Sequence, residues 1–170
     1  MQKMLKWQLA APLAALGGGV LGVFGAVIQE VFYGSLFAAF VAGPMIEEAM
    51  KPTGLYLLYA LRPEAIPGRM YRAVLAALGG LSFAVVENIF YLEVYYPEHD
   101  GALRLFRYTW TLGMHVALSF IVGLGVNERL LRSVRGEVPF LSGNWRFFVI
   151  PMILHSLFNI VMVVSGGRWV

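Results

Sequence analysis

Six ionisable side chains lie inside long apolar stretches of the sequence, where charge is costly. They are Glu47, Glu48, Lys51, Glu87, His115 and His155. An ionisable group within a membrane span costs about 3 kcal/mol or more, and such groups normally face the interior of a bundle or a water-filled cavity. Because they come from four separate stretches, we expect them to converge on one polar cavity.

The spacing of these residues gives them local partners. Lys51 follows Glu47 by four residues and Glu48 by three, so either carboxylate can reach it on one helix face. Adjacent residues point about 100° apart on a helix. We therefore expect one glutamate to pair with Lys51 and the other to face the cavity. His155 and Asn159 are four residues apart, which places them on one face.

Structural roles are the alternatives for each group. Glu47, Glu48 and Lys51 can form a salt bridge that fixes helix packing. The imidazole and amide of the His155–Asn159 pair can hydrogen-bond between helices. Glu87 and Asn88 lie nearer the end of their stretch, so a solvated face is an alternative for them.

Several catalytic classes lack their residues. The sequence has no cysteine, its only aspartate is Asp100 in a polar stretch, and it contains neither H-E-x-x-H nor G-x-S-x-G. These absences disfavour thiol, aspartyl and zincin chemistry and leave no obvious serine nucleophile. Glutamate and histidine remain, and their chemistry is hydrolysis by an activated water. A carboxylate with two histidines is also a usual catalytic zinc set, and the sequence leaves the metal-bound and metal-free forms open.

The elements that position these residues are expected to be transmembrane helices. Of 170 residues, 59% are hydrophobic and 14% charged, against about 45–50% and 25% in soluble domains. We expect one domain, residues 1–170, folded as an all-α polytopic bundle of about five spans. The second is long and broken by Pro44 and Pro52. The expected spans are residues 9–28, 33–61, 72–92, 105–126 and 147–165.

The basic residues predict the orientation of the bundle. With five spans, nine of the 13 Lys and Arg residues fall at the N-terminus and in the loops at 62–72 and 127–146, and three fall on the other side. The positive-inside rule then places the N-terminus in the cytoplasm and the C-terminus outside. Because the basic residues occupy short loops, we expect membrane lipid, and no nucleic acid, as a partner.

Four motifs resemble those of one known family. Glu47-Glu48-Ala-Met-Lys51 resembles the EExxK motif of the PrsW-type intramembrane proteases, and residues 83–88, ending in Glu87-Asn88, resemble their FxxxEN motif. His115 and the segment 155–159 resemble their two later histidine motifs. The wider clan is similar to the type II CAAX prenyl endopeptidases and the Aph subunit of gamma-secretase.

The resemblance implies an intramembrane endopeptidase in a bacterial plasma membrane, acting on a membrane-anchored protein or peptide such as an anti-sigma factor. It implies that the glutamate, histidine and asparagine side chains surround a catalytic water. We expect the base to be Glu47 or Glu48, and favour Glu47, with Glu48 paired to Lys51.

The remaining residues have expected roles as well. His155 and Asn159 would stabilise the oxyanion, His115 and Glu87 would hold the water or ligate a metal, and Asn88 would support them. If a divalent metal is bound, zinc is the first candidate, with ligands drawn from Glu47, Glu48, His115 and His155.

The cavity itself has an expected position. We expect one of the two carboxylates on the second span to lie within about 8 Å of both imidazoles, near the membrane midplane. Glu87 should lie closer to the outer side, where the cavity should open. The rival classes are a non-catalytic membrane scaffold and a proton-coupled transporter that uses the carboxylates as a relay.

Overall fold

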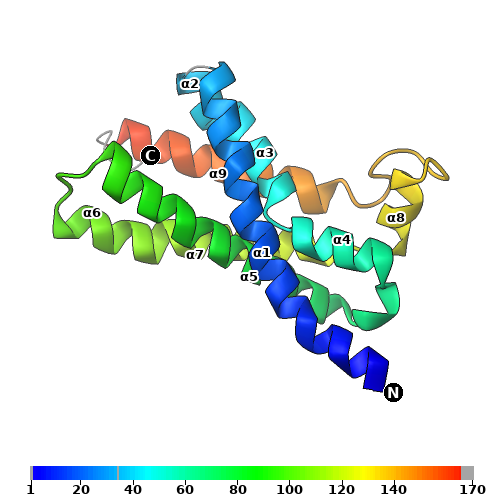
Figure 1. The fold of residues 1–170 in the computed structure, drawn as a ribbon. Coiled ribbons are helices and arrows are strands. Elements are labelled where there is room, and N and C mark those ends of the chain that lie inside the picture. The colour runs from blue at the N-terminus through cyan, green and yellow to red at the C-terminus, as the bar shows by residue number, and fades with distance from the viewer. Residues whose placement is uncertain (1, 34, 166–170) are drawn as a thin grey trace.

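The computed structural model describes residues 2–33 and 35–165, and within them every regular element is helical. The four longest helices are α1 (Gln2–Tyr33), α5 (Arg69–Phe90), α7 (Leu112–Gly125) and α9 (Arg146–Val164) (Figure 1). The shorter helices are α2 (Ser35–Phe37), α3 (Gly43–Met50), α4 (Thr53–Leu61), α6 (Gly101–Phe106), α8 (Glu128–Val134) and the 3₁₀ turn η2 (Pro63–Ala65).

Four helical stretches of the described chain are long and apolar enough to cross a membrane. They are Leu9–Ile28, Arg69–Tyr95, Gly101–Gly125 and Arg146–Val164. Each overlaps a span expected from the sequence, and the all-helical transmembrane bundle is confirmed. The expected second span is the exception, because its residues do not form one continuous helix.

This second segment is interrupted where its prolines predicted. Pro44 stands in the first turn of α3, and the helix ends at Met50. Lys51 and Pro52 form a turn before α4 begins at Thr53. Pro52 has no N–H and cannot continue the hydrogen-bond ladder of α3. In Figure 1, α4 accordingly runs in a different direction from α3.

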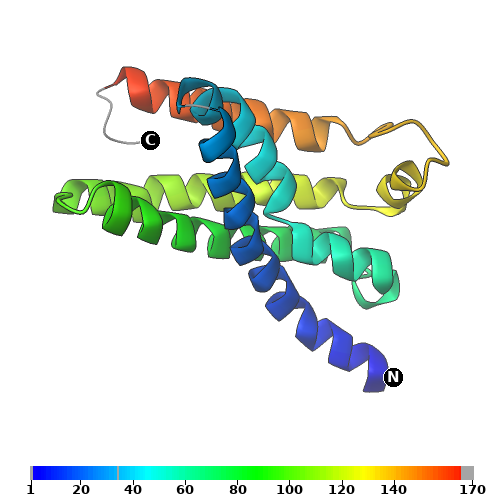
Figure 2. The ribbon, with the colours of Figure 1, turned by 45° about the horizontal axis from the view of Figure 1, so that its top comes forward.

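Helix α5 lies at the centre of the packing, between α1 and α7. Helices α5, α7 and α9 run alongside one another, and α1 crosses them at an angle (Figure 2). The short α3 contacts α1 on one side and α9 on the other. The carboxylates of α3 are thereby enclosed by the same bundle that carries the histidines of α7 and α9.

Glycines allow the helix backbones to approach closely at three places near the buried charges. A Cβ on Gly18 of α1 would collide with the Gly54 amide of α4, and one on Gly19 would collide with the Gly79 carbonyl of α5. A Cβ on Gly80 would stand 2.7 Å from the backbone oxygen of His115. Small residues at helix contacts are the usual means of close packing in lipid.

The described residues include three π-helical turns: η1 (Ala38–Ala42), η3 (Tyr91–Tyr95) and η4 (Arg107–Thr111). They follow α2, follow α5 and precede α7, respectively. Each contributes residues to the same cavity. Such turns are rare and frequently occur at functional sites, because they shift the hydrogen-bond register and redirect side chains.

Candidate active site

The two glutamates of α3 point in different directions, as adjacent helical residues should. Glu48 is fully buried and its Oε1 accepts a 2.6 Å hydrogen bond from Lys51 Nζ. Glu47 Oε2 lies 3.5 Å from the same ammonium and lines a cavity. Lys51 is itself fully buried. The shorter of the two distances shows that it pairs mainly with Glu48. Glu47 is the carboxylate that faces open space.

His155 connects α9 to both glutamates. Its Nδ1 lies 2.8 Å from Glu48 Oε1, and its Nε2 lies 3.8 Å from Glu47 Oε2. Because an ionised carboxylate only accepts hydrogen bonds, Nδ1 carries the hydrogen that it donates to Glu48. The lone pair of Nε2 is thereby directed towards Glu47.

His115 of α7 is held between a cation and a carboxylate. Its Nδ1 lies 2.6 Å from Lys51 Nζ, and its Nε2 lies 3.1 Å from Glu87 Oε2. An ammonium only donates, so Nδ1 accepts and the hydrogen sits on Nε2, which donates to Glu87. The two imidazole rings are perpendicular, with centroids 5.0 Å apart.

Asn159 is held by a carbonyl that the π-helical turn η1 leaves free. In this register an amide bonds the carbonyl five residues earlier, as Gly43 does to Ala38. The next carbonyl, that of Ala39, would need the amide of Pro44, which has none. Asn159 Nδ2 donates to the Ala39 carbonyl instead, at 2.7 Å. Asn159 therefore ties α9 to η1 one turn from His155.

Arg107, one of the three basic residues counted on the side opposite the N-terminus, is a further member of the site. It is only 3% exposed, and its Nη2 donates to Glu87 Oε2 at 3.0 Å. Its Nε donates to Asn88 Oδ1 at 2.9 Å, and Asn88 Nδ2 donates to the Arg107 carbonyl at 3.0 Å. The guanidinium lies 3.6 Å from the Tyr91 ring centroid. Glu87 and Asn88 of α5 are thus anchored to η4; Asn88 is fully buried, and Glu87 faces the cavity.

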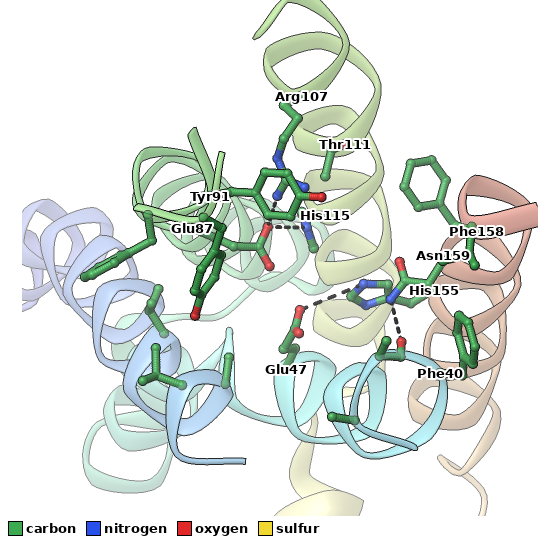
Figure 3. A pocket seen from close by; sticks show the side chains of 18 of the residues that line it. Phe40, Glu47, Glu87, Tyr91, Arg107, Thr111, His115, His155, Phe158 and Asn159 are labelled. Carbon is green, nitrogen blue, oxygen red and sulfur yellow. Dashed lines mark hydrogen bonds and ion pairs between the residues drawn. The ribbon is translucent and has the colours of Figure 1, made fainter. Parts of the chain in front are cut away.

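These side chains surround a cavity of about 630 Å³. Figure 3 shows Glu47, Glu87, His115 and His155 directed into it from four helices. Its remaining polar lining residues are Arg107, Thr111 and Asn159. Apolar and aromatic residues complete the wall, among them Val27, Leu36, Phe90, Tyr95, Tyr96 and Phe158. Neither Glu48 nor Lys51 lines the cavity.

The cavity extends towards one end of the bundle. Its outer lining residues come from the C-terminal half of α1, from the last turns of α5 and α9 and from the π-helical turn η3. These elements adjoin the connection between α5 and α6, at the end remote from the α4–α5 connection. An opening here would face the external side under the orientation expected from the basic loops.

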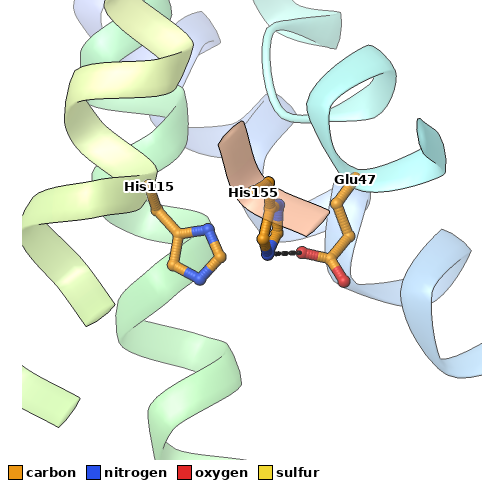
Figure 4. A group of neighbouring side chains, drawn as sticks. All are labelled: Glu47, His115 and His155. Atoms are coloured by element: carbon orange, nitrogen blue, oxygen red, sulfur yellow. Dashed lines mark ion pairs between the residues drawn. The ribbon is translucent and has the colours of Figure 1, made fainter. Parts of the chain in front are cut away.

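The donor set fits a divalent metal ion. Glu47, His115 and His155 each offer one ligand atom, and these atoms lie within 4.8 Å of one another (Figure 4). Bonds of about 2.1 Å in a tetrahedral zinc site hold ligand atoms about 3.4 Å apart, so small side-chain rotations would close the set. Binding through His115 would displace Lys51 from Nδ1 or Glu87 from Nε2.

The other carboxylates occupy places that suit a metal centre. Metal-bound histidines usually donate their second ring hydrogen to a carboxylate, which fixes the tautomer. Glu48 does this for His155, and Glu87 does it for His115. Among the described side chains, three carboxylates and two cations, Lys51 and Arg107, meet around the site, which leaves the carboxylates one in excess. A divalent ion would offset that surplus.

Comparison with known proteins agrees with this chemistry. The model of the family described as PrsW family intramembrane metalloprotease matches residues 6–170. No curated protein and no solved structure matches the chain. The match includes every residue of the site and all four membrane-crossing stretches. The chain therefore belongs to the PrsW family of intramembrane metalloproteases and is an integral membrane peptidase.

Proposed function

We propose that the chain is an endopeptidase that cleaves membrane-anchored substrates in this cavity, with Glu47 as the general base. The observation that carries the proposal is the Glu47 carboxylate: Glu47 lines the cavity, and its Oε2, 3.5 Å from Lys51 Nζ, makes no hydrogen bond to any described residue. A carboxylate oxygen in this position can take a proton from an attacking water. Glu48, which is bonded to Lys51 and His155, has no access to such a water.

Glu47, His115 and His155 are the residues that would hold a metal ion, and zinc suits one carboxylate and two imidazoles. A bound ion would polarise the attacking water and the scissile carbonyl. The support for this assignment is the closeness of the three ligand atoms and the surplus carboxylate charge.

The remaining polar residues hold the site in shape. Glu48 and Glu87 orient the two imidazoles, while Lys51 and Arg107 neutralise those carboxylates. Asn159 uses one amide hydrogen on the Ala39 carbonyl and has a second for the oxyanion of the tetrahedral intermediate.

The substrates are proposed from the shape and position of the cavity. Its wall is apolar and aromatic apart from the site itself, which suits an extended apolar segment next to the membrane face. We propose that the chain forms a single domain over residues 1–170 and lies in a bacterial plasma membrane. Its N-terminus would be cytoplasmic, because nine basic residues share that side. Cleavage would then occur towards the external face.

Metal analysis combined with a cleavage assay tests the proposal. Purified protein should contain about one zinc ion per chain. It should cleave members of a pooled library of single-span peptides in lipid vesicles, as read by mass spectrometry. Chelation should stop cleavage and added zinc should restore it, and His115→Ala and His155→Ala should each lose the ion. Undiminished cleavage by metal-free protein would reject the metal, and an inactive wild type would reject the peptidase assignment.

A further inference from the structure

Thr111 is a cavity residue without an assigned role. It is the last residue of η4 and lies one turn before His115, on the same face of the helix. The side chain is 4% exposed and lines the cavity, and its Oγ1 has no hydrogen-bond partner in the described part of the chain. Figure 3 shows it beside His115 on the cavity wall. A buried hydroxyl without a partner is unfavourable, so its ligand should come from the cavity.

The neighbouring Thr109 shows what a helical threonine usually does. Its hydroxyl donates to the Leu105 carbonyl, four residues earlier, at 2.7 Å, as is common for threonine in helices. For Thr111 the equivalent carbonyl is that of Arg107, which accepts a hydrogen bond from Asn88 Nδ2 at 3.0 Å. The same carbonyl also accepts from the Leu112 amide. Because its two lone pairs are both used, the Thr111 hydroxyl is left facing the cavity.

Other hydrogen-bond donors around the cavity are largely occupied. The exception is the Tyr91 hydroxyl, which is also buried without a partner among the described residues and belongs to a ring that lies against the Arg107 guanidinium. The single ring hydrogens of His155 and His115 are both donated to glutamates, Glu48 and Glu87 respectively. Asn159 has already given one amide hydrogen to a backbone carbonyl. Peptide hydrolysis needs donors aimed at the carbonyl oxygen as negative charge develops on it. The hydroxyl hydrogen of Thr111 is not donated to any described residue.

We propose that Thr111 is a further catalytic residue, whose hydroxyl donates a hydrogen bond to the oxygen of the scissile carbonyl. This inference depends on the proposed function. As the water oxygen bonds to the carbonyl carbon, one water proton passes to Glu47. The carbonyl π electrons move to the carbonyl oxygen, and the Thr111 hydroxyl donates a hydrogen bond to the oxyanion that forms. When the carbonyl re-forms, the C–N bond breaks and the proton on Glu47 goes to the leaving amine.

Three variants test this role: Thr111→Val, which keeps the shape and removes the hydroxyl; Thr111→Ser, which keeps the hydroxyl; and Thr109→Val as the matched control. Rates are measured on those single-span peptides that the wild type cleaves, per folded protein after size exclusion. Loss of one oxyanion donor typically lowers kcat about 10²-fold. We expect that loss in Thr111→Val, with KM and zinc content unchanged. Thr111→Ser should stay within about tenfold of the wild type, and Thr109→Val should match it.

The outcomes separate this inference from the proposed function. A wild type that cleaves no peptide overturns both. An active wild type with an equally active Thr111→Val overturns only the role of Thr111, as does an equal loss in Thr111→Ser and Thr111→Val. If Thr111→Val does not fold, Thr111→Ala removes the hydroxyl without adding bulk, and its kcat decides between the same two results.

Discussion

The two glutamates of α3 should separate catalysis from stability when each is changed to glutamine. Glu48→Gln removes a charge bonded to Lys51 at 2.6 Å and to His155 at 2.8 Å, in a fully buried position. Removing one partner of a buried ion pair costs about 3–5 kcal/mol. At about 2–4 °C per kcal/mol for a chain of this size, the thermal midpoint in detergent should fall by about 6–20 °C.

Glu47→Gln should behave in the opposite way. Glu47 is 3.5 Å from the Lys51 ammonium and borders the cavity, so Glu48 still neutralises the lysine when Glu47 is lost. The midpoint should stay within about 4 °C of the wild type, since little buried charge is left unpaired. Loss of the general base should lower kcat at least about 10²-fold.

The assay compares both variants with Glu64→Gln, a change at an exposed glutamate of η2. Thermal midpoints are read by the loss of the monodisperse peak in detergent, and kcat is read on the peptides that the wild type cleaves. A Glu47→Gln protein that unfolds readily yet cleaves normally, beside a stable Glu48→Gln, would refute the division of roles.

Two further predictions concern packing and topology. Gly80→Ala should lower the thermal midpoint by several degrees, because its Cβ would stand 2.7 Å from a backbone oxygen of α7. Gly113→Ala has no atom within 4 Å and should leave the midpoint unchanged or raised; equal losses in both would contradict the close contact. Tags in the loops at 62–72 and 127–146 should report the cytoplasm, and a tag in 93–107 the outside. The reversed labelling pattern would overturn the orientation.

The sequence was sufficient to predict the broad plan of the molecule. Polar residues inside apolar stretches had to face one interior, because lipid cannot solvate them. The structure brings Glu47, His115 and His155 together in this way. The prolines likewise predicted the break after α3, since Pro52 removes a backbone donor wherever it falls.

The part played by Arg107 was beyond the reach of the basic-residue count. That count treats a charge near a span end as solvated. Arg107 is desolvated because Glu87 and Asn88, about twenty residues earlier, accept its hydrogen bonds. One signal was present in the sequence: Arg107, Thr111 and His115 follow one another at intervals of four, so they share a helix face.

The π-helical turns were also not predictable from residue patterns. Their amino-acid composition does not distinguish them from the surrounding helix, and they change the partner of each carbonyl by one residue. The bond from Asn159 to the Ala39 carbonyl depends on that shift together with Pro44. The four-residue spacing placed His155 and Asn159 on a common helix face, but it could not identify the backbone carbonyl that accepts the hydrogen bond of the amide.

The glycine contacts of α1 provide a point about which this helix can tilt. At Gly18 and Gly19 its backbone lies directly against the backbones of α4 and α5. Beyond that point α1 meets the cavity through Val23, Ala26 and Val27. Val27 lies nine residues after Gly18, about 14 Å along the helix axis. A tilt of α1 by about 10° at Gly18 would therefore move Val27 by about 2 Å. A tilt of this size would widen the cavity beside α1 while the contacts at Gly18 and Gly19 stay in place; it would also have to shift Met50 of α3, which packs against Gly25.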